Sequence, residues 1–199
     1  IPNKVESLQI GWCNSMKFLT QISIDETNKN FTFLDDDKKI IIGKSNMKND
    51  SFDSLIIACR DTEKVVIPNC IEKICSYAFS NCYKLETVDF ECNSNLREIE
   101  KGAFNNSAIE EIFIPASVES IGKKAFANCN NLRFVEFEEN SQVQVFGDFC
   151  FSNSFIKSIK IPKSVKSIGS SAFFDCNNLR KIEFEENSVL NSIGKLAFF

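Results

Sequence analysis

Histidine is absent from this chain of 199 residues, and glycine, proline and methionine are scarce, with seven, four and two residues. The absence of histidine excludes Ser–His–Asp and Cys–His nucleophiles and every His-ligated metal site. No apolar run approaches the roughly 20 residues of a membrane-spanning helix. The 23 basic residues are outnumbered by 27 acidic ones and form no run typical of nucleic-acid binders. We therefore expect no catalytic, cofactor or metal site, no nucleic-acid partner and no membrane span in this segment.

Phenylalanine and cysteine, by contrast, are abundant, with 20 and nine residues. Apolar residues make up 43% of the chain, which suffices for a packed core. The length fits one domain of ordinary size or one segment of a larger array. Because the sequence starts at Ile1-Pro2, without a methionine or a signal peptide, we expect a fragment of a longer protein.

Internal repetition dominates the sequence from residue 67 onward. One version of the unit begins at Ile67, Ile114 and Ile161, and a second version begins at Phe90, Phe137 and Phe184. Each version recurs every 47 residues, so the period consists of two coils, alternately 23 and 24 residues long. Coils of this length are typical of leucine-rich-type repeats and are much shorter than helical-hairpin repeats.

Each coil carries three apolar residues at spacings of three and then two. The triplets are Leu85/Val88/Phe90, Ile109/Ile112/Ile114, Leu132/Val135/Phe137, Ile156/Ile159/Ile161 and Leu179/Ile182/Phe184. The last two members of each triplet flank one other residue, which is the period of a short strand with one buried face. Stacked coils place these strands side by side, so we predict a parallel β-sheet on the concave face of a solenoid.

A second apolar pattern lies between successive triplets. Ala-Phe pairs, or Cys-Phe in one coil, follow a polar turn in every repeat. Their aromatic members are Phe79, Phe104, Phe126, Phe151, Phe173 and Phe198. We predict that these rings stack as a spine inside the wall opposite the sheet, and that short helical turns form that wall.

The N-terminal third follows the repeat less closely. Residues 1–24 fit one coil, with Leu19, Ile22 and Ile24 at the triplet positions. Residues 25–66 break the period and contain four short strand-like runs, FTFL, KKIIIG, SLIIAC and KVVI. We predict an N-terminal repeat coil over 1–24, a β-hairpin island over 25–66 that prolongs the sheet, and repeats over 67–199, all in one continuous solenoid.

The consensus IPxSVxSIGxxAFxxCxxLxxIxF resembles the BspA-like leucine-rich repeats, found in surface proteins of anaerobic bacteria and of trichomonad parasites. The island resembles a segment that interrupts many trichomonad-type members. This resemblance implies an α/β leucine-rich-repeat solenoid in a surface antigen, adhesin or ligand binder, located at the cell surface or secreted. It carries no catalytic motif.

The cysteines follow the two-coil period rather than a disulfide framework. Cys82, Cys129 and Cys176 occupy one position in alternate coils. Two coils separate their Cα atoms by about 9.6 Å, beyond the roughly 7 Å that a disulfide spans, so we predict buried thiols. Cys70 and Cys92 lie in adjacent coils at similar positions, which leaves a bridge between them open.

The outward positions of the predicted sheet are candidates for binding a partner. The candidate residues are Glu86, Asp89, Glu110, Glu111, Phe113, Arg133, Phe134, Lys157, Lys160, Arg180 and Lys181. Carboxylates occupy the first two coils and cations the last three, with the two aromatic residues at the junction. Exposed aromatic residues flanked by charge are typical of binding hot spots, although charge alone also keeps a sheet soluble.

Two functions from different classes fit the sequence. The first is a non-enzymatic recognition or adhesion module that binds a host or microbial protein, or a cell surface, through the concave sheet. The second is a structural spacer or coat element that self-associates through its ends or sides, because the last coil would expose Ile193 and Phe198. An intracellular scaffold is a third possibility, which the unpaired thiols favour. Acceptor sequons at Asn30, Asn49 and Asn105 are compatible with secretion.

Overall fold

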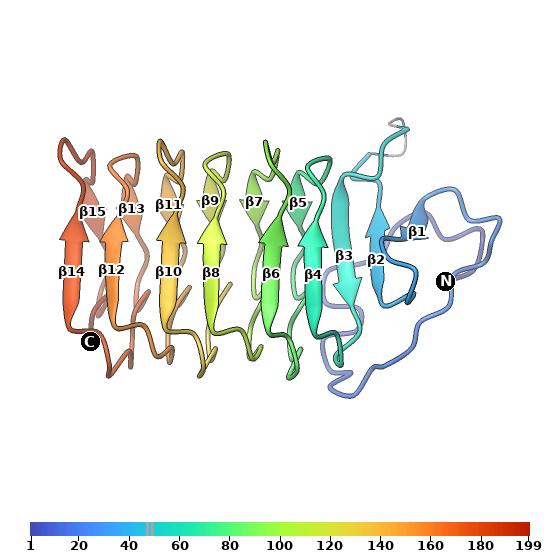
Figure 1. Ribbon diagram of the computed structural model, residues 1–199, viewed down its shortest axis with the longest axis horizontal. Coiled ribbons are helices and arrows are strands. Elements are labelled where there is room, and N and C mark those ends of the chain that lie inside the picture. The colour runs from blue at the N-terminus through green and yellow to red at the C-terminus, as the bar shows by residue number, and fades with distance from the viewer. Residues whose placement is uncertain (47, 49) are drawn as a thin grey trace.

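The computed structural model describes residues 1–46, 48 and 50–199. The chain winds into a β-solenoid whose coils stack along one axis, with the N-terminal segment at one end (Figure 1). Every coil has three walls: a four-residue strand, a two-residue strand and a wall of turns. The first row of strands consists of β4 (Lys64–Ile67), β6 (Thr87–Phe90), β8 (Glu111–Ile114), β10 (Phe134–Phe137), β12 (Ser158–Ile161) and β14 (Lys181–Phe184). The second row consists of β5 (Lys73–Ile74), β7 (Glu98–Ile99), β9 (Ser120–Ile121), β11 (Val145–Phe146), β13 (Ser167–Ile168) and β15 (Ser192–Ile193).

The predicted triplets form the first row, and its strands run parallel, which confirms that part of the prediction. The expectation of one continuous sheet there is wrong. The first row divides into three two-stranded ladders, β4–β6, β8–β10 and β12–β14. The continuous sheet of the molecule is instead the second row, whose strands pair in one parallel series from β5 to β15.

The wall of turns contains no helix in the described part of the chain, so the predicted helical turns and the α/β class are wrong. The reason lies in where the backbone donors point. The N–H of each spine phenylalanine donates to the carbonyl of the residue before the next spine phenylalanine, at 2.7–2.8 Å. An N–H that bonds to the next coil cannot bond to a carbonyl four residues earlier in its own coil, as an α-helix requires.

The predicted aromatic spine is present. The rings of Phe79, Phe104, Phe126, Phe151, Phe173 and Phe198 stack in that order. Successive ring centroids lie 5.0–5.3 Å apart, and the ring planes are within 16° of parallel. The first five rings are fully buried. The Phe excess of the composition is therefore in part a packing requirement of the fold.

Neighbouring coils approach so closely at one corner that only glycine fits there. A Cβ atom built on Gly147 would lie 2.6 Å from the Lys123 nitrogen, and one on Gly169 would lie 2.5 Å from the Asp148 nitrogen. Real Cβ atoms do not approach backbone atoms so closely. This corner therefore fixes the distance between coils through backbone contact.

Residues 31–58 form the predicted hairpins. β1 (Phe31–Phe33) pairs antiparallel with β2 (Ile40–Gly43), and β2 pairs antiparallel with β3 (Ser54–Ala58). β3 then pairs parallel with β5, so the hairpins prolong the second row rather than the triplet row that the sequence suggested. With them the second row becomes a nine-stranded sheet.

Residues 1–24 contain no strand, yet their apolar side chains point inward as the triplet pattern suggested. Leu19, Ile22 and Ile24 pack against a small core formed with Ile41 and Ile57 on the outer face of the hairpins. The division of the chain into units 1–24, 25–66 and 67–199 stays a prediction.

Arg60 ties the N-terminal segment to the solenoid. Its side chain is fully buried, and no described carboxylate pairs with it. Instead its nitrogens donate to the carbonyls of Met16, Ala58 and Ala78 at 3.2–3.3 Å. A buried charge keeps its proton and its stability only when such acceptors surround it, so these three contacts hold residues 1–24 against the first coils.

We predict that Phe126→Ala destabilises the chain by about 3–5 kcal/mol, because it removes a buried ring that two stacked neighbours contact. Urea unfolding followed by circular dichroism measures the change. Phe18→Ala is the matched control, since its ring is 83% exposed, and it should change stability by less than about 0.5 kcal/mol. Equal losses from the two variants would contradict the assignment of the spine as the core.

Candidate binding surface

The exposed side of the first strand row, here called the β4–β14 face, is the surface that the sequence analysis singled out. Alternate residues of each strand point outward, as in β8, where Glu111 and Phe113 are exposed while Ile112 and Ile114 are buried. All eleven candidate residues are exposed. The alternation thus predicted their exposure correctly, while their role in binding stays a prediction.

Seams divide this face between β6 and β8 and between β10 and β12, and Figure 1 shows the strands grouped in pairs accordingly. The paired strands are 23 residues apart, as Val65 and Val88 are, whereas the strands on either side of a seam are 24 residues apart. The additional length lies mainly in the connection that leaves the first row, seven residues from β6 to β7 against five from β4 to β5. The seams therefore follow from coil length.

The first seam opens into a hollow of about 430 Å³, here called the seam hollow. Its lining residues are Thr87, Val88, Asp89, Glu111, Ile112, Phe113, Phe134 and Glu136. The side chains of Val88 and Ile112 are buried, so these two residues present backbone atoms to it. Each strand of a two-stranded ladder has an edge whose N–H and C=O groups the ladder does not use, and here the edges of β6 and β8 face each other.

Two aromatic rings stand at this hollow. Phe113 and Phe134 are 52% and 48% exposed and come from the neighbouring strands β8 and β10. The register places Phe134 opposite Glu111, and Phe113 opposite Glu136. Side chains directly opposite in neighbouring strands are in contact range. The ring of Phe134 also lies under the ammonium group of Lys157, 5.9 Å from its centroid.

The remaining candidates fall on either side of the seam hollow. Glu86, Glu110 and Arg133 line a second hollow of about 630 Å³, while Lys160 lines a third of about 350 Å³ at the other seam. Phe134 lines all three hollows and is their shared wall. Arg180 and Lys181 line none of these three hollows. Sequence reasoning missed the roles of Thr87 and Glu136 in the first hollow, although the alternating coil length pointed to the seam.

Charge is distributed unevenly over this face. Lys160 pairs with Glu185 at 3.4 Å, and Lys181 pairs with Glu183 at 2.8 Å, so part of the basic half is neutralised internally. On the acidic half, none of the ion pairs found among the described residues involves the carboxylates that line the seam hollow. The acidic half therefore carries its charge uncompensated.

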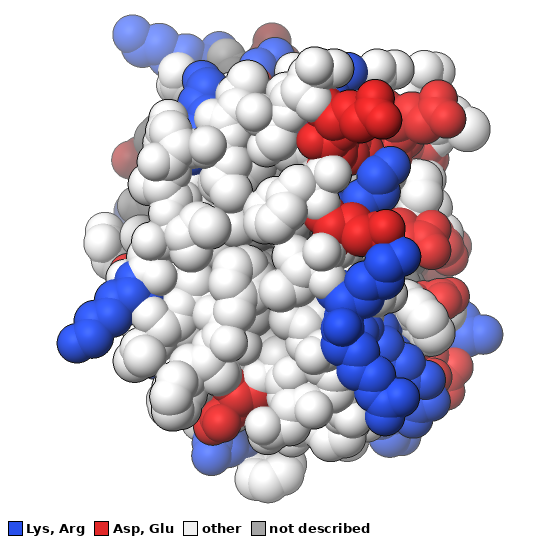
Figure 2. All heavy atoms as spheres, turned by 90° about the vertical axis from the view of Figure 1, so that its left-hand side faces the viewer, with Lys and Arg blue, Asp and Glu red and all other residues white. Residues whose placement is uncertain are grey.

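The end of the stack beyond β14 has a different character. Figure 2 looks onto this end and shows a largely uncharged centre with Lys, Arg, Asp and Glu gathered along its right-hand margin. Ile193 and Phe198 are exposed, as the sequence analysis expected. Val189, Leu196 and Phe199 are exposed beside them.

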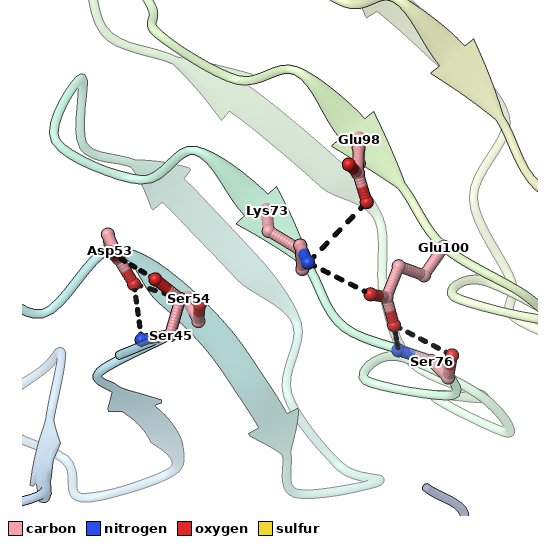
Figure 3. A network of polar contacts seen from close by, with 7 residues as sticks. All are labelled: Ser45, Asp53, Ser54, Lys73, Ser76, Glu98 and Glu100. Carbon is pink, nitrogen blue, oxygen red and sulfur yellow. Dashed lines mark hydrogen bonds and ion pairs between the residues drawn. The ribbon is translucent and has the colours of Figure 1, made fainter. Parts of the chain in front are cut away.

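A further groove, of about 680 Å³, lies between the N-terminal segment and the second row. Lys73 and Glu100 line it together with Trp12. Figure 3 shows that the Lys73 ammonium lies between Glu98 and Glu100, at 3.5 and 3.4 Å. Glu100 also accepts hydrogen bonds from the backbone and the side chain of Ser76, both at 2.8 Å. The charges of this groove thus satisfy one another.

The cysteine column is buried and reduced, as predicted. Burial raises the pKa of the Cys82 thiol to about 12 and that of Cys129 to about 11. The Cys129 thiol donates to the carbonyl of Phe104 at 3.0 Å, and the side chain of Ser107 contacts its sulfur at 3.5 Å. These groups are structural donors rather than nucleophiles, because the thiolate is strongly disfavoured.

Cys70 and Cys92 are both exposed and free. Ser117, which occupies the Cys70 position two coils later, donates to the carbonyl of Leu96 in the preceding coil. A side chain at this position therefore points toward the preceding coil, whereas Cys92 belongs to the following one. This direction disfavours a bridge.

The sequons differ in their surroundings. The Asn30 side chain is half-buried and donates to the carbonyl of Val5 at 3.4 Å. Asn105 is half-buried beside the spine, and its sequon serine, Ser107, is buried against Cys129. Asn49 lies outside the described residues. Modification at all three sites stays a prediction.

Within the described residues no group of three or more Cys, Asp and Glu side chains is arranged to hold a metal ion. The same part of the chain contains no helix of the length and apolarity needed to cross a membrane.

The three-walled coils with a repeated apolar triplet define a leucine-rich-repeat solenoid. Six copies of the BspA type leucine rich repeat region match residues 45–154 and 144–199, so the chain belongs to this family. A comparison with curated proteins finds no match. The trichomonad-type assignment within the family stays a prediction.

Solved structures with the same fold come from bacteria. The pneumococcal vaccine antigen PcpA is 33% identical, with a TM-score of 0.61 over 63% of this chain and 31% of that chain. A leucine-rich repeat protein from Eubacterium ventriosum is 20% identical, with a TM-score of 0.76 over 92% of this chain and 47% of that one. The match to the second protein shows the fold alone. The chain spans less than half the length of either protein.

We predict that Ellman's reagent at pH 8 labels two thiols rapidly in the native chain, Cys70 and Cys92, because burial shields the others or raises their pKa. All nine thiols should react after unfolding in urea. A variant with Cys70→Ser and Cys92→Ser is the control and should show no rapid phase. Rapid labelling of further thiols in the native chain would contradict the packing of the column.

Proposed function

We propose that the chain is a non-enzymatic recognition or adhesion module of a cell-surface or secreted protein. It binds a protein or cell-surface partner, of host or microbial origin, through the β4–β14 face, which the sequence analysis took as the concave one. The observation that carries this proposal is the pair of half-exposed rings, Phe113 and Phe134, at one hollow. Large apolar side chains exposed together in a recess and surrounded by polar groups are the usual centre of a binding interface.

The charges around the rings support the same face. Carboxylates lie on the β6 side of Phe113, and cations such as Lys160 and Arg180 lie on the β12 side of Phe134. An interface with opposite charges at its two ends favours one orientation of a charged partner and raises the association rate. A partner with the reverse polarity fits this arrangement.

Family membership supports an interaction module as well. Solenoid repeats present extended surfaces, and proteins of this kind generally act by binding. PcpA is described as a vaccine antigen, a role that requires exposure to the outside of the cell. This similarity supports a surface or secreted location for the present chain.

We predict that Phe113→Ala combined with Phe134→Ala abolishes displaceable binding of the labelled chain to cell surfaces. Cultured epithelial cells and bacterial cells serve as probes, and flow cytometry with unlabelled chain as competitor measures specific binding. Both rings are half-exposed, so thermal stability should change by less than about 1 kcal/mol.

Phe18→Ala is the matched control, because its exposed ring lies on the N-terminal segment, away from the β4–β14 face. It should leave cell binding unchanged. Binding that survives the double variant would place the contact surface elsewhere on the solenoid. An absence of displaceable binding to either cell type would count against the recognition function itself.

The second candidate, a structural element that self-associates, is favoured by the largely uncharged end beyond β14 (Figure 2). Apolar side chains in a contiguous exposed patch mark a surface that packs against another protein surface. The exposed side chains there include Ile193 and Phe199.

If this end drives association, light scattering should show a mass that rises with concentration. Ile193→Lys combined with Phe199→Lys should then restore a monomer, because a buried unpaired charge opposes apolar contact. Val66→Lys, an equally exposed position on β4, serves as control. A chain that is monomeric at every concentration measured would rule out this route of self-association.

A further inference from the structure

The seam hollow has a composition found nowhere else among the hollows of the β4–β14 face. It is lined by three carboxylates, Asp89, Glu111 and Glu136, and by two aromatic rings, with no lysine or arginine in its lining. The other two hollows each include a basic side chain, Arg133 in one and Lys160 in the other. The electrostatic field of the seam hollow is therefore negative.

Each ring is placed directly opposite a carboxylate by the β8–β10 register, Phe134 opposite Glu111 and Phe113 opposite Glu136. The face of an aromatic ring carries partial negative charge and attracts a cation. A carboxylate at the edge of the same ring adds a charged hydrogen-bond acceptor. The two ring–carboxylate pairs cross diagonally and thus surround one recess with groups that attract a cation.

Two further observations support a cationic occupant. The Lys157 ammonium lies over the ring of Phe134, which shows that this ring already accepts a basic group from within the chain. In addition, the unpaired edges of β6 and β8 leave backbone carbonyl groups at the seam, and these can accept hydrogen bonds from an ammonium or a guanidinium.

We propose that the seam hollow binds a lysine or arginine side chain projecting from the partner protein. The alkyl stem of that side chain lies along the rings of Phe113 and Phe134, and its charged head contacts the carboxylates of Asp89, Glu111 and Glu136. This assignment rests on the proposed recognition function and names the chemistry that the β4–β14 face selects. A basic anchor in this hollow, together with acidic groups facing Arg180 and Lys181, matches the charge gradient of the whole face.

The test uses a blocked five-residue peptide, Gly-Ser-Lys-Ser-Gly, titrated into the isotopically labelled chain and followed by the amide NMR signals of Asp89 and Phe113. A peptide with norleucine in place of lysine has a stem of similar length but lacks the charge. We expect the lysine peptide to shift these signals saturably and the norleucine peptide to bind about tenfold more weakly or worse.

Two charge-matched variants separate this hollow from general attraction. Glu111→Gln with Glu136→Gln removes two carboxylates of the hollow, while Glu86→Gln with Glu110→Gln removes two from the same face outside it. We expect the first pair to weaken lysine-peptide binding about tenfold, and the second to change it by less than about threefold. Equal weakening by both pairs, equal binding of the norleucine peptide, or no shift with the lysine peptide would each overturn the proposal.

Cell binding distinguishes failure here from failure of the proposed function. If Phe113→Ala with Phe134→Ala abolishes cell binding while Glu111→Gln with Glu136→Gln leaves it intact, the recognition face stands and the basic anchor is wrong. If the lysine peptide occupies the hollow but the chain shows no displaceable cell binding, the hollow stands and the recognition function is wrong.

Discussion

The requirement that each coil repeat the position of its neighbour governs this structure. At the wall of turns, the N–H of one coil donates to a carbonyl of the next at 2.7–2.8 Å, and the spine rings stack 5.0–5.3 Å apart. At the glycine corner, backbones approach until a Cβ on Gly169 would lie 2.5 Å from the nitrogen of Asp148. Since two walls are held this tightly, any difference in coil length must appear in the third, and it appears as the seams of the β4–β14 face.

How far the sequence predicts the fold depends on whether the repeat itself encodes a feature. The triplets and the aromatic spine recur in every coil, so their burial could be inferred from the sequence. The second strand row was missed because each of its strands has two residues and one buried side chain, such as Ile74 or Ile99, which is too short for an alternating pattern. The helical turns were wrong because hydrogen bonding between coils replaced bonding within the coil, and a sequence pattern does not reveal that choice.

The candidate surface was predictable in part for the same reason. Phe113 and Phe134 occupy positions that are polar or charged in the other coils, so their exposure followed from the alternation. The hollow between them did not, because it depends on which strands form ladders. That depends on small differences in the connections, seven residues after β6 against five after β4. Glu136 joins the site through the register with Phe113, which only the structure provides.

The alternation of coil lengths also bears on how an array of this kind can grow. A seam arises only where a 24-residue step follows a 23-residue step, so insertion or loss of one coil would place two like steps next to each other and alter the ladders. Duplication of the 47-residue pair, by contrast, preserves every ladder and adds one new seam. Lengthening by pairs thus multiplies recesses whose side chains can diverge independently, as Asp89 and Glu111 at one seam and Lys160 at the next already have.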